Sequence, residues 1–225
     1  MVIRLTNGVG KFAAHWQMHV HKISCHQGCC TGELPYLRVY CLLITAVRKY
    51  TMSRDLAGQI YQRAHLVGDF LLRSGRRSTE YFDKYLFECD PSLLRRIADE
   101  MVALLPANTE VIAGLELGGI PLVTALGLAT GLPMAFVRKQ AKDYGTCKLA
   151  EGAPIEGRHV VVVEDVVTSG GQVATSIGEL RQRGAIIEVA LCVIDRQQGG
   201  QDLLAEHGIT LRPLFTMEQL VAAAQ

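Results

Sequence analysis

Four consecutive valines, Val160–Val163, are the feature that most constrains the fold of this 225-residue chain. An unbroken apolar run is typical of a strand buried on both faces, the usual state of a central strand in a parallel sheet. Glu164 and Asp165 follow the run, and a turn of small residues at 168–171 precedes a helical segment from Gln172. The N–H groups of such a turn and the helix dipole favour a phosphate, and paired carboxylates accept hydrogen bonds from sugar hydroxyls. The segment therefore predicts a site for a phosphorylated sugar.

Downstream of Met52, the apolar pattern alternates between helical and strand spacing. A helix is expected from Ser53 to about Leu72, an aromatic strand over Tyr81–Phe87, and a capped helix from Pro91 to about Leu105. Further strands are expected at Val111–Leu115, Met134–Val137, Val160–Val163, Glu188–Ile194 and Leu211–Leu214, and further helices at Pro121–Thr130, Gln172–Arg183, Gln201–Glu206 and Met217–Ala223. This alternation predicts an α/β fold with a central parallel sheet flanked by helices, which binds ligands where its strands end.

Two more loops follow predicted strands and have suitable chemistry. Residues 116–121 contain Gly118 and Gly119, which let backbone N–H groups approach a ligand, although a simple tight turn is the alternative. Arg196 follows Asp195 at a strand end, where an arginine can hold a carboxylate through two hydrogen bonds. A surface ion pair between Asp195 and Arg196 is the alternative there.

A cationic segment follows the predicted strand at 134–137. Arg138, Lys139 and Lys142 place three cations within five residues, at the start of a long loop that reaches Gly157. A loop of this length inside a domain is often a functional lid, and a solvated surface loop is the alternative.

Residues 160–172 resemble the phosphoribosyl diphosphate (PRPP) motif of the type I phosphoribosyltransferases, which is a hydrophobic run, two acids, two apolar residues and a Thr/Ser-Gly-Gly turn. Within that family, the segments 72–78 with 81–85, 138–145 and 195–200 are similar to those of the orotate phosphoribosyltransferases. The resemblance covers essentially all of residues 52–225. It implies a type I phosphoribosyltransferase-like fold with a small N-terminal hood over the base.

The resemblance also implies a role for individual residues. It assigns PRPP binding to Arg73, Arg138, Lys139, Lys142, Tyr144, Glu164, Asp165, Val166, Val167, Thr168, Ser169, Gly170, Gly171 and Gln172. Thr168 and Arg196 would bind orotate, and Lys142, Asp165 and Arg138 would carry catalysis. Tyr144 stands where many members have His, so it can supply a neutral hydrogen bond but no charge near neutral pH.

The implied reaction transfers 5-phosphoribosyl from PRPP to orotate, giving orotidine 5′-monophosphate and diphosphate in pyrimidine (UMP) biosynthesis. Cations that close over the diphosphate would stabilise its developing charge and exclude water. Mg²⁺ is expected to bind mainly through PRPP, without direct protein ligands. The segment 138–145 is similar to the mobile loop of the family, and we expect a homodimer that shares this loop across its subunits. No nucleic-acid or membrane partner is expected. Cysteines 89, 147 and 192 are too scattered for a disulfide framework, which favours the cytoplasm.

The first 51 residues differ in composition from the rest. They hold six Lys/Arg and one acid, whereas residues 52–225 hold seventeen Lys/Arg and twenty-one Asp/Glu. The shift marks a boundary near Met52, between an N-terminal extension at 1–51 and a phosphoribosyltransferase domain at 52–225. We expect the extension to be non-native, from translation starting at Met52, or disordered. A zinc site made by His21, Cys25, His26, Cys29 and Cys30, and a targeting peptide, are the alternatives.

Two other functions compete with orotate transfer. A purine or uracil phosphoribosyltransferase would share the PRPP motif, but Arg196 and the aromatic segment 81–85 disfavour it. A PRPP-sensing regulator of transcription or RNA would keep the fold. The excess of acids over residues 52–225 disfavours a nucleic-acid partner, because such binding needs a basic surface.

Overall fold

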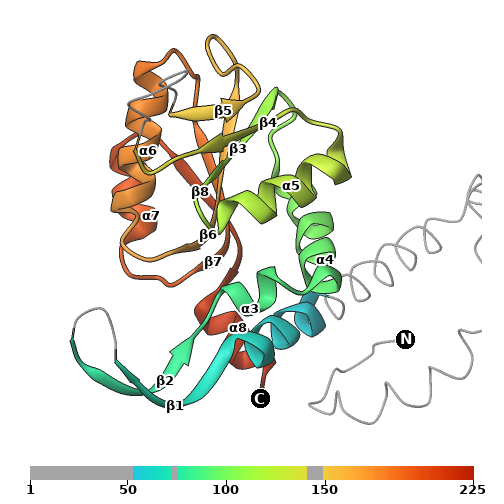
Figure 1. Ribbon diagram of the computed structural model, residues 1–225, viewed down its shortest axis with the longest axis vertical. Helices are drawn as coiled ribbons and strands as arrows, with labels where there is room; N and C mark the ends of the chain where they lie inside the picture. Colours follow the sequence, from blue (N-terminus) through green and yellow to red (C-terminus); the bar gives the residue numbers. More distant parts are fainter. Residues whose placement is uncertain (1–52, 72–74, 141–148) are drawn as a thin grey trace, which may run out of the picture. The chain divides into compact units, whose positions relative to one another are not determined.

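The computed structural model describes residues 53–71, 75–140 and 149–225 (Figure 1). After a helix at residues 53–64, the elements are β1 (His65–Leu71), β2 (Arg77–Phe82), α3 (Tyr85–Glu88), α4 (Pro91–Met101), a 3₁₀ turn (Val102–Leu104), β3 (Val111–Leu115), α5 (Gly119–Thr130), β4 (Met134–Val137), β5 (Ala150–Gly152), β6 (Val160–Val167), α6 (Gly171–Gln182), β7 (Val189–Asp195), α7 (Gly200–Glu206), β8 (Thr210–Thr216) and α8 (Met217–Ala223). The predicted α/β fold is confirmed.

A six-stranded sheet in the order β5-β4-β3-β6-β7-β8 forms the centre of the domain. All neighbouring strands run parallel except β5, which pairs antiparallel with β4. β6 lies in the middle, and its four valines are at most 3% exposed. Val161 and Val163 enter one apolar cluster while Val160 and Val162 enter another, so the strand is buried on both faces as predicted.

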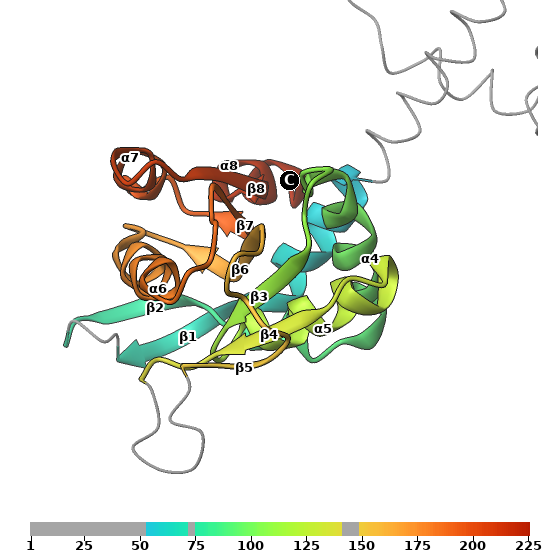
Figure 2. The ribbon, with the colours of Figure 1, turned by 90° about the horizontal axis from the view of Figure 1, so that it is seen from above.

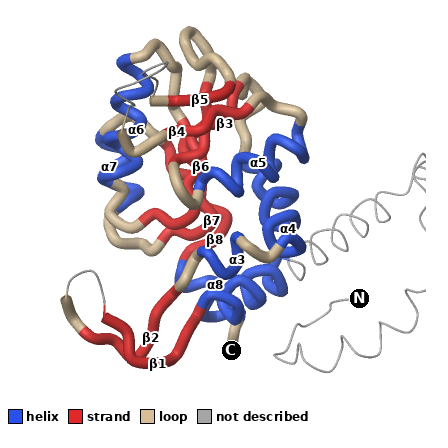
Figure 3. The backbone as a smooth tube through the Cα atoms, in the orientation of Figure 1, coloured by secondary structure: helices blue, strands red, loops and turns tan. Residues whose placement is uncertain are grey.

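Helices cover both faces of this sheet. Figures 2 and 3 show α4 and α5 on one side and α6 with α7 on the other. The first side also receives apolar residues from helix 53–64 and from α8, such as Ile60 and Leu220, both fully buried. On the other side, Ile177 of α6 and Leu204 of α7 are fully buried. This layering leaves the carboxyl ends of the strands as the sheet edge from which the predicted ligand loops emerge.

The chain between helix 53–64 and α3 corrects two predictions. The helix expected to reach Leu72 ends at residue 64, and the strand β1 follows it in an antiparallel hairpin with β2. Gly68 weakens a helix at this point, and the pairing with β2 supplies the backbone with other partners. The hairpin, drawn at the lower left of Figure 1, is the two-stranded element in the position of the expected hood.

The strand expected over Tyr81–Phe87 is also only partly correct. β2 ends at Phe82, because the Asp83 N–H donates to the carbonyl of Ala64 (2.8 Å) and its side chain accepts from the Tyr85 N–H (3.1 Å). A short helix, α3, begins there instead. It buries Phe87 completely, which explains the aromatic content that suggested a strand.

The long segment after Arg138 is not wholly a loop. Its far end forms β5, which pairs with β4 along Ala135–Val137. The Arg138 N–H also donates to the carbonyl of Leu149 (2.9 Å). A three-residue strand is too short to show an apolar pattern, so it cannot be predicted from the sequence. The expected extension at 1–51 and the residues Arg73, Lys142 and Tyr144 lie outside the described residues.

No helix within the described residues is long and apolar enough to cross a membrane.

Leu126→Ala in α5 should lower the free energy of unfolding by about 2–5 kcal/mol, because the Leu126 side chain is fully buried against the sheet. Leu128, two residues along the same helix, is 81% exposed, so Leu128→Ala should change it by less than about 0.5 kcal/mol. Urea unfolding followed by circular dichroism measures both. Equal losses in the two variants would contradict the orientation of α5.

Candidate active site

The candidate site lies where β3, β4, β6 and β7 end, because the carboxyl ends of neighbouring parallel strands meet at one edge of a sheet. The glycine loop at 116–119 follows β3, and Arg138 and Lys139 follow β4. The acids and small-residue turn belong to the end of β6 and the start of α6, and Arg196 follows β7. The predicted site residues that the structure describes therefore lie together at the carboxyl ends of the strands.

The turn between β6 and α6 has the geometry of an anion site. Gly170 has φ +77°, a left-handed conformation that glycine adopts without strain, and α6 starts directly after it. Thr168 and Ser169 are exposed, so their hydroxyls face solvent. A Cβ added at Gly171 would meet no atom within 4 Å, so the helix start is open. Unpaired N–H groups at an open helix start can hold a phosphate.

The loop after β7 is fixed to this turn by backbone contacts. The Arg196 N–H donates to the carbonyl of Val167 (2.9 Å), while the Asp195 carboxylate accepts from the Gln197 N–H (2.8 Å). Arg196 itself is exposed and Asp195 is buried. The Arg196 guanidinium is therefore available to a ligand, whereas the Asp195 carboxylate organises the loop.

The first two loops are also joined to each other. The Lys139 N–H donates to the Glu116 carboxylate (2.6 Å), and the Glu116 N–H donates to the carbonyl of Val137 (2.9 Å). The Glu116–Leu117 peptide bond is cis, and the Leu117 side chain is exposed. The cationic segment after β4 thus starts beside the glycine loop after β3, so both can face one ligand.

Asp165 differs from the other predicted site residues because its side chain is completely buried. Lys84 Nζ lies 2.6 Å from Asp165 Oδ2 and forms an ion pair with it. Gly118 packs directly against the carboxylate, since a Cβ built there would come within 1.5 Å of Asp165 Oδ2. Asp165 therefore supports the glycine loop from below.

Three carboxyl groups and one ammonium share this region, and the pKa values of Glu88, Glu164 and Lys84 are displaced. Burial, together with the Asp165 carboxylate, raises the pKa of Glu88 to about 9 and that of Glu164 to about 9. Burial alone would lower the pKa of Lys84, but contact with Asp165 outweighs it and the net shift is upward. The cluster thus retains more protons near neutral pH than isolated side chains would.

Sequence reasoning missed Lys84 and Glu88. The sequence predicts a strand over the segment that contains Lys84, and it assigns no role to Glu88. In the structure, Lys84 is the N-cap residue of α3 and Glu88 is its last residue, so one turn of helix brings both under the end of β6. A charged residue directly after the buried Phe87 is the one sequence signal that pointed to an unusual environment.

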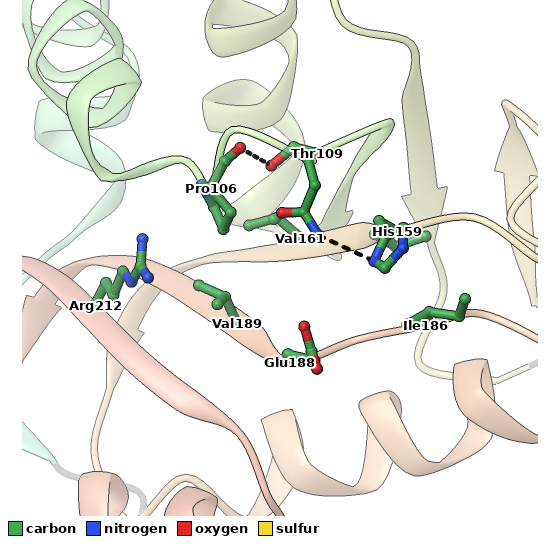
Figure 4. Close-up of a pocket in the computed structure, with 10 residues that line it drawn as sticks. Pro106, Thr109, His159, Val161, Ile186, Glu188, Val189 and Arg212 are labelled. Carbon is green, nitrogen blue, oxygen red and sulfur yellow. Dashed lines mark hydrogen bonds between the residues drawn. The ribbon is translucent and has the colours of Figure 1, made fainter.

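A separate hollow of about 230 Å³ lies at the opposite edge of the sheet, near the start of β6 and β7 (Figure 4). In it, the Asn108 amide nitrogen lies 3.3 Å from His159 Nδ1, and the Thr109 hydroxyl donates to the Pro106 carbonyl (2.7 Å). Its lining includes none of the predicted site residues. The hollow is therefore distinct from the candidate site.

Comparison with known proteins gives the family. Residues 91–207 match the phosphoribosyl transferase domain family. An orotate phosphoribosyltransferase of Nocardioides sp. is 50% identical over 175 residues, which cover 78% of this chain and 98% of that protein. The chain belongs to the orotate phosphoribosyltransferase family.

Solved structures of orotate phosphoribosyltransferases are also similar. That of Aeropyrum pernix is 34% identical with a TM-score of 0.63, covering 74% of this chain and 97% of that chain. That of Mycobacterium tuberculosis in complex with PRPP is 26% identical with a TM-score of 0.65, covering 75% of this chain and 98% of that chain. The type I phosphoribosyltransferase fold expected from the PRPP motif is confirmed.

Gly118→Ala should destabilise the protein, because the new methyl group would displace the Asp165 carboxylate or the glycine loop. A cost of about 1–3 kcal/mol would lower the melting temperature by several degrees. Gly178→Ala is the matched control, because it lies inside α6 with nothing within 4 Å of the added Cβ and should be neutral or stabilising. Differential scanning calorimetry measures both; an unchanged melting temperature in Gly118→Ala would contradict the packing described.

Proposed function

We propose that this protein transfers the 5-phosphoribosyl group of PRPP to orotate, forming orotidine 5′-monophosphate and diphosphate as a glycosyltransferase of pyrimidine biosynthesis. The observation that carries the proposal is the backbone bond between Arg196 and Val167 (2.9 Å), which fixes the loop bearing Arg196 beside the turn of the PRPP motif. A cation suited to a carboxylate thus starts next to an open phosphate site. Family membership supports the same reaction.

PRPP would contact both the turn after β6 and the loops after β3 and β4. The turn at 168–171 and the start of α6 would hold the 5-phosphate through N–H groups and hydroxyls, joined by Val166, Val167 and Gln172 of the motif. Glu164, which is only half-buried, would accept hydrogen bonds from the ribose hydroxyls. Asp165 is completely buried against Gly118, so it would act on PRPP without direct contact, by holding the glycine loop in place and through its negative charge.

The diphosphate would face the loops after β3 and β4. Arg138 and Lys139 start beside the glycine loop, so their charges would stabilise the leaving group. By family resemblance, Lys142, Tyr144 and Arg73, which lie outside the described residues, would complete these contacts. Closure of cations over the site would also exclude the water that hydrolyses the sugar.

Orotate would bind through its carboxylate to Arg196 and through a hydrogen bond to Thr168. Both side chains are exposed at the edge of the sheet. The ring nitrogen of orotate is the nucleophile, so the chain needs to supply no nucleophile of its own. Its contribution is orientation and electrostatic stabilisation.

Mg²⁺ would enter with PRPP. Diphosphate oxygens are hard ligands that Mg²⁺ prefers, and it usually keeps water molecules in its remaining positions. A metal carried in this way suits the residues, because Arg138, Lys139 and the glycine loop would form a site for diphosphate. When bound, Mg²⁺ neutralises charge on the diphosphate.

The proposal also covers the assembly of the protein and its location. Val67 and Leu71 of β1 are 79% and 73% exposed, and a homodimer that shares the mobile loop would give such apolar side chains a cover. A cytoplasmic location suits an enzyme of pyrimidine biosynthesis. Residues 1–51 would lie outside the catalytic domain at 52–225.

The reaction is tested by following the ultraviolet absorbance of orotate with purified protein, Mg²⁺ and PRPP. A fall that depends on PRPP is expected, because formation of orotidine 5′-monophosphate changes the conjugated ring. Adenine, guanine and uracil in place of orotate should give no PRPP consumption. Consumption with another base and none with orotate would assign the site to a different phosphoribosyltransferase.

Arg196→Ala should raise the KM for orotate about 10-fold or more while changing the KM for PRPP much less, because a charged hydrogen bond to the base is lost. Arg183→Ala is the matched control: Arg183 is an exposed arginine at the far end of α6, bonded to the carbonyl of Glu179 (2.8 Å), and its loss should leave both constants unchanged. Initial rates with each substrate varied in turn give the constants. Equal increases in both constants would contradict the contact with the base.

A further inference from the structure

Two buried carboxyl oxygens below the candidate active site have no hydrogen-bond partner within the described part of the chain. They are Glu88 Oε1, on a side chain whose residue is 5% exposed, and Asp165 Oδ2, whose residue is 0% exposed. Both border Gly118, since a Cβ built on that glycine would lie 2.9 Å from Glu88 Oε1 and 1.5 Å from Asp165 Oδ2. Burying polar oxygens without a hydrogen-bond partner costs free energy, so the burial of these two oxygens needs an explanation.

A single proton between the two carboxyl groups provides both oxygens with a hydrogen bond. Two ionised carboxylates can only accept hydrogen bonds, so they cannot bond to each other. A protonated carboxyl has one O–H donor, and a carboxylate beside it accepts a short, charge-assisted bond. One proton shared by Glu88 and Asp165 therefore gives Glu88 Oε1 a hydrogen bond, and gives Asp165 Oδ2 one in addition to its ion pair with Lys84.

The charged groups around Glu88 identify it as the side chain that carries the proton. Asp83 and Lys84 precede it on the α3 side, and Glu164 and Asp165 face it from β6. The ammonium of Lys84 is committed to Asp165 at 2.6 Å, so the negative charge of the pair is stabilised on Asp165. Burial and the Asp165 carboxylate raise the pKa of Glu88 to about 9, in agreement with this arrangement.

We propose that Glu88 is a positioning residue that stays protonated at neutral pH and donates a hydrogen bond to Asp165. The bond joins α3 to the end of β6, and both carboxyl groups pack against Gly118 of the glycine loop. Its consequence for catalysis rests on the proposed function. Because Gly118 belongs to the loop assigned to diphosphate and Asp165 holds that loop in place, loss of the bond affects PRPP rather than orotate.

Stability as a function of pH tests the proton without any substrate. Between pH 4.5 and 9 the folded protein holds a proton on Glu88 that the unfolded chain has released, so wild-type stability falls as pH rises through this window. Glu88→Gln keeps an N–H donor but does not titrate. The melting temperature of Glu88→Gln minus that of the wild type should increase by about 3 °C per pH unit between pH 6 and 9. Glu206→Gln, an exposed substitution on α7, should show no such trend.

Infrared spectroscopy locates the proton directly. The wild type at pH 7.5 should show the carbonyl band of protonated carboxyl groups, and Glu88→Gln should remove the part of that band that belongs to Glu88. Glu164→Gln separates the other candidate, because the pKa of Glu164 is also raised to about 9. A band lost only in Glu164→Gln, no band in the wild type, or a gap in melting temperature that does not vary with pH would each overturn the proposal.

Kinetics then test the positioning role. Glu88→Ala, which removes the donor, should raise the KM for PRPP about 10-fold while the KM for orotate changes less than about 3-fold. Glu88→Gln should restore the PRPP constant to within about 3-fold of the wild type, because its amide replaces the O–H donor. Failure of the glutamine variant to rescue would overturn positioning by a donated bond. An inactive wild type would instead reject the proposed function, while the pH and infrared results would still decide the proton.

Discussion

The burial of one negative charge, that of Asp165, is the constraint on which the arrangement of the site depends. A carboxylate removed from water costs several kcal/mol unless a cation and hydrogen bonds compensate it. Lys84 supplies the cation from the start of α3, and Phe87 anchors that helix in the core. Gly118 supplies the necessary space by having no side chain. The hairpin region, the glycine loop and the central strand must therefore be correctly placed together for the charge to be tolerated.

The remaining geometry follows from the topology of the sheet. Parallel strands bring their loops to one edge, but they do not fix the loops relative to each other. Here hydrogen bonds from backbone N–H groups do so in pairs: Lys139 to the Glu116 carboxylate, and Arg196 to the Val167 carbonyl. Lys139, Arg196 and Val167 take part through backbone atoms, and only Glu116 takes part through its side chain. The cationic side chains can therefore change while the loops stay in place.

Local pattern predicted the sheet well and the start of the domain poorly. The bounds of β3, β4 and α8 agree with the expected ranges, because each is a short apolar or capped segment between clear turn residues. Residues 65–71 have helical spacing yet form a strand, because pairing with β2 outweighs their weak helical preference. The acids of β6 were found because they stand together in the chain. Lys84 and Glu88 were not, because only tertiary packing brings them to Asp165.

The close approach of Gly170 and Gly200 links the first turns of α6 and α7. A Cβ at Gly200 would come within 2.6 Å of the Thr168 carbonyl, and one at Gly170 within 3.0 Å of the Gly200 carbonyl. The turn that faces the phosphate and the loop that carries Arg196 therefore pack too closely to move independently. Lengthening either by a residue would displace the other. Divergence toward other bases within this scaffold is thus confined to exchange of side chains in the loop, with its length and both glycines preserved.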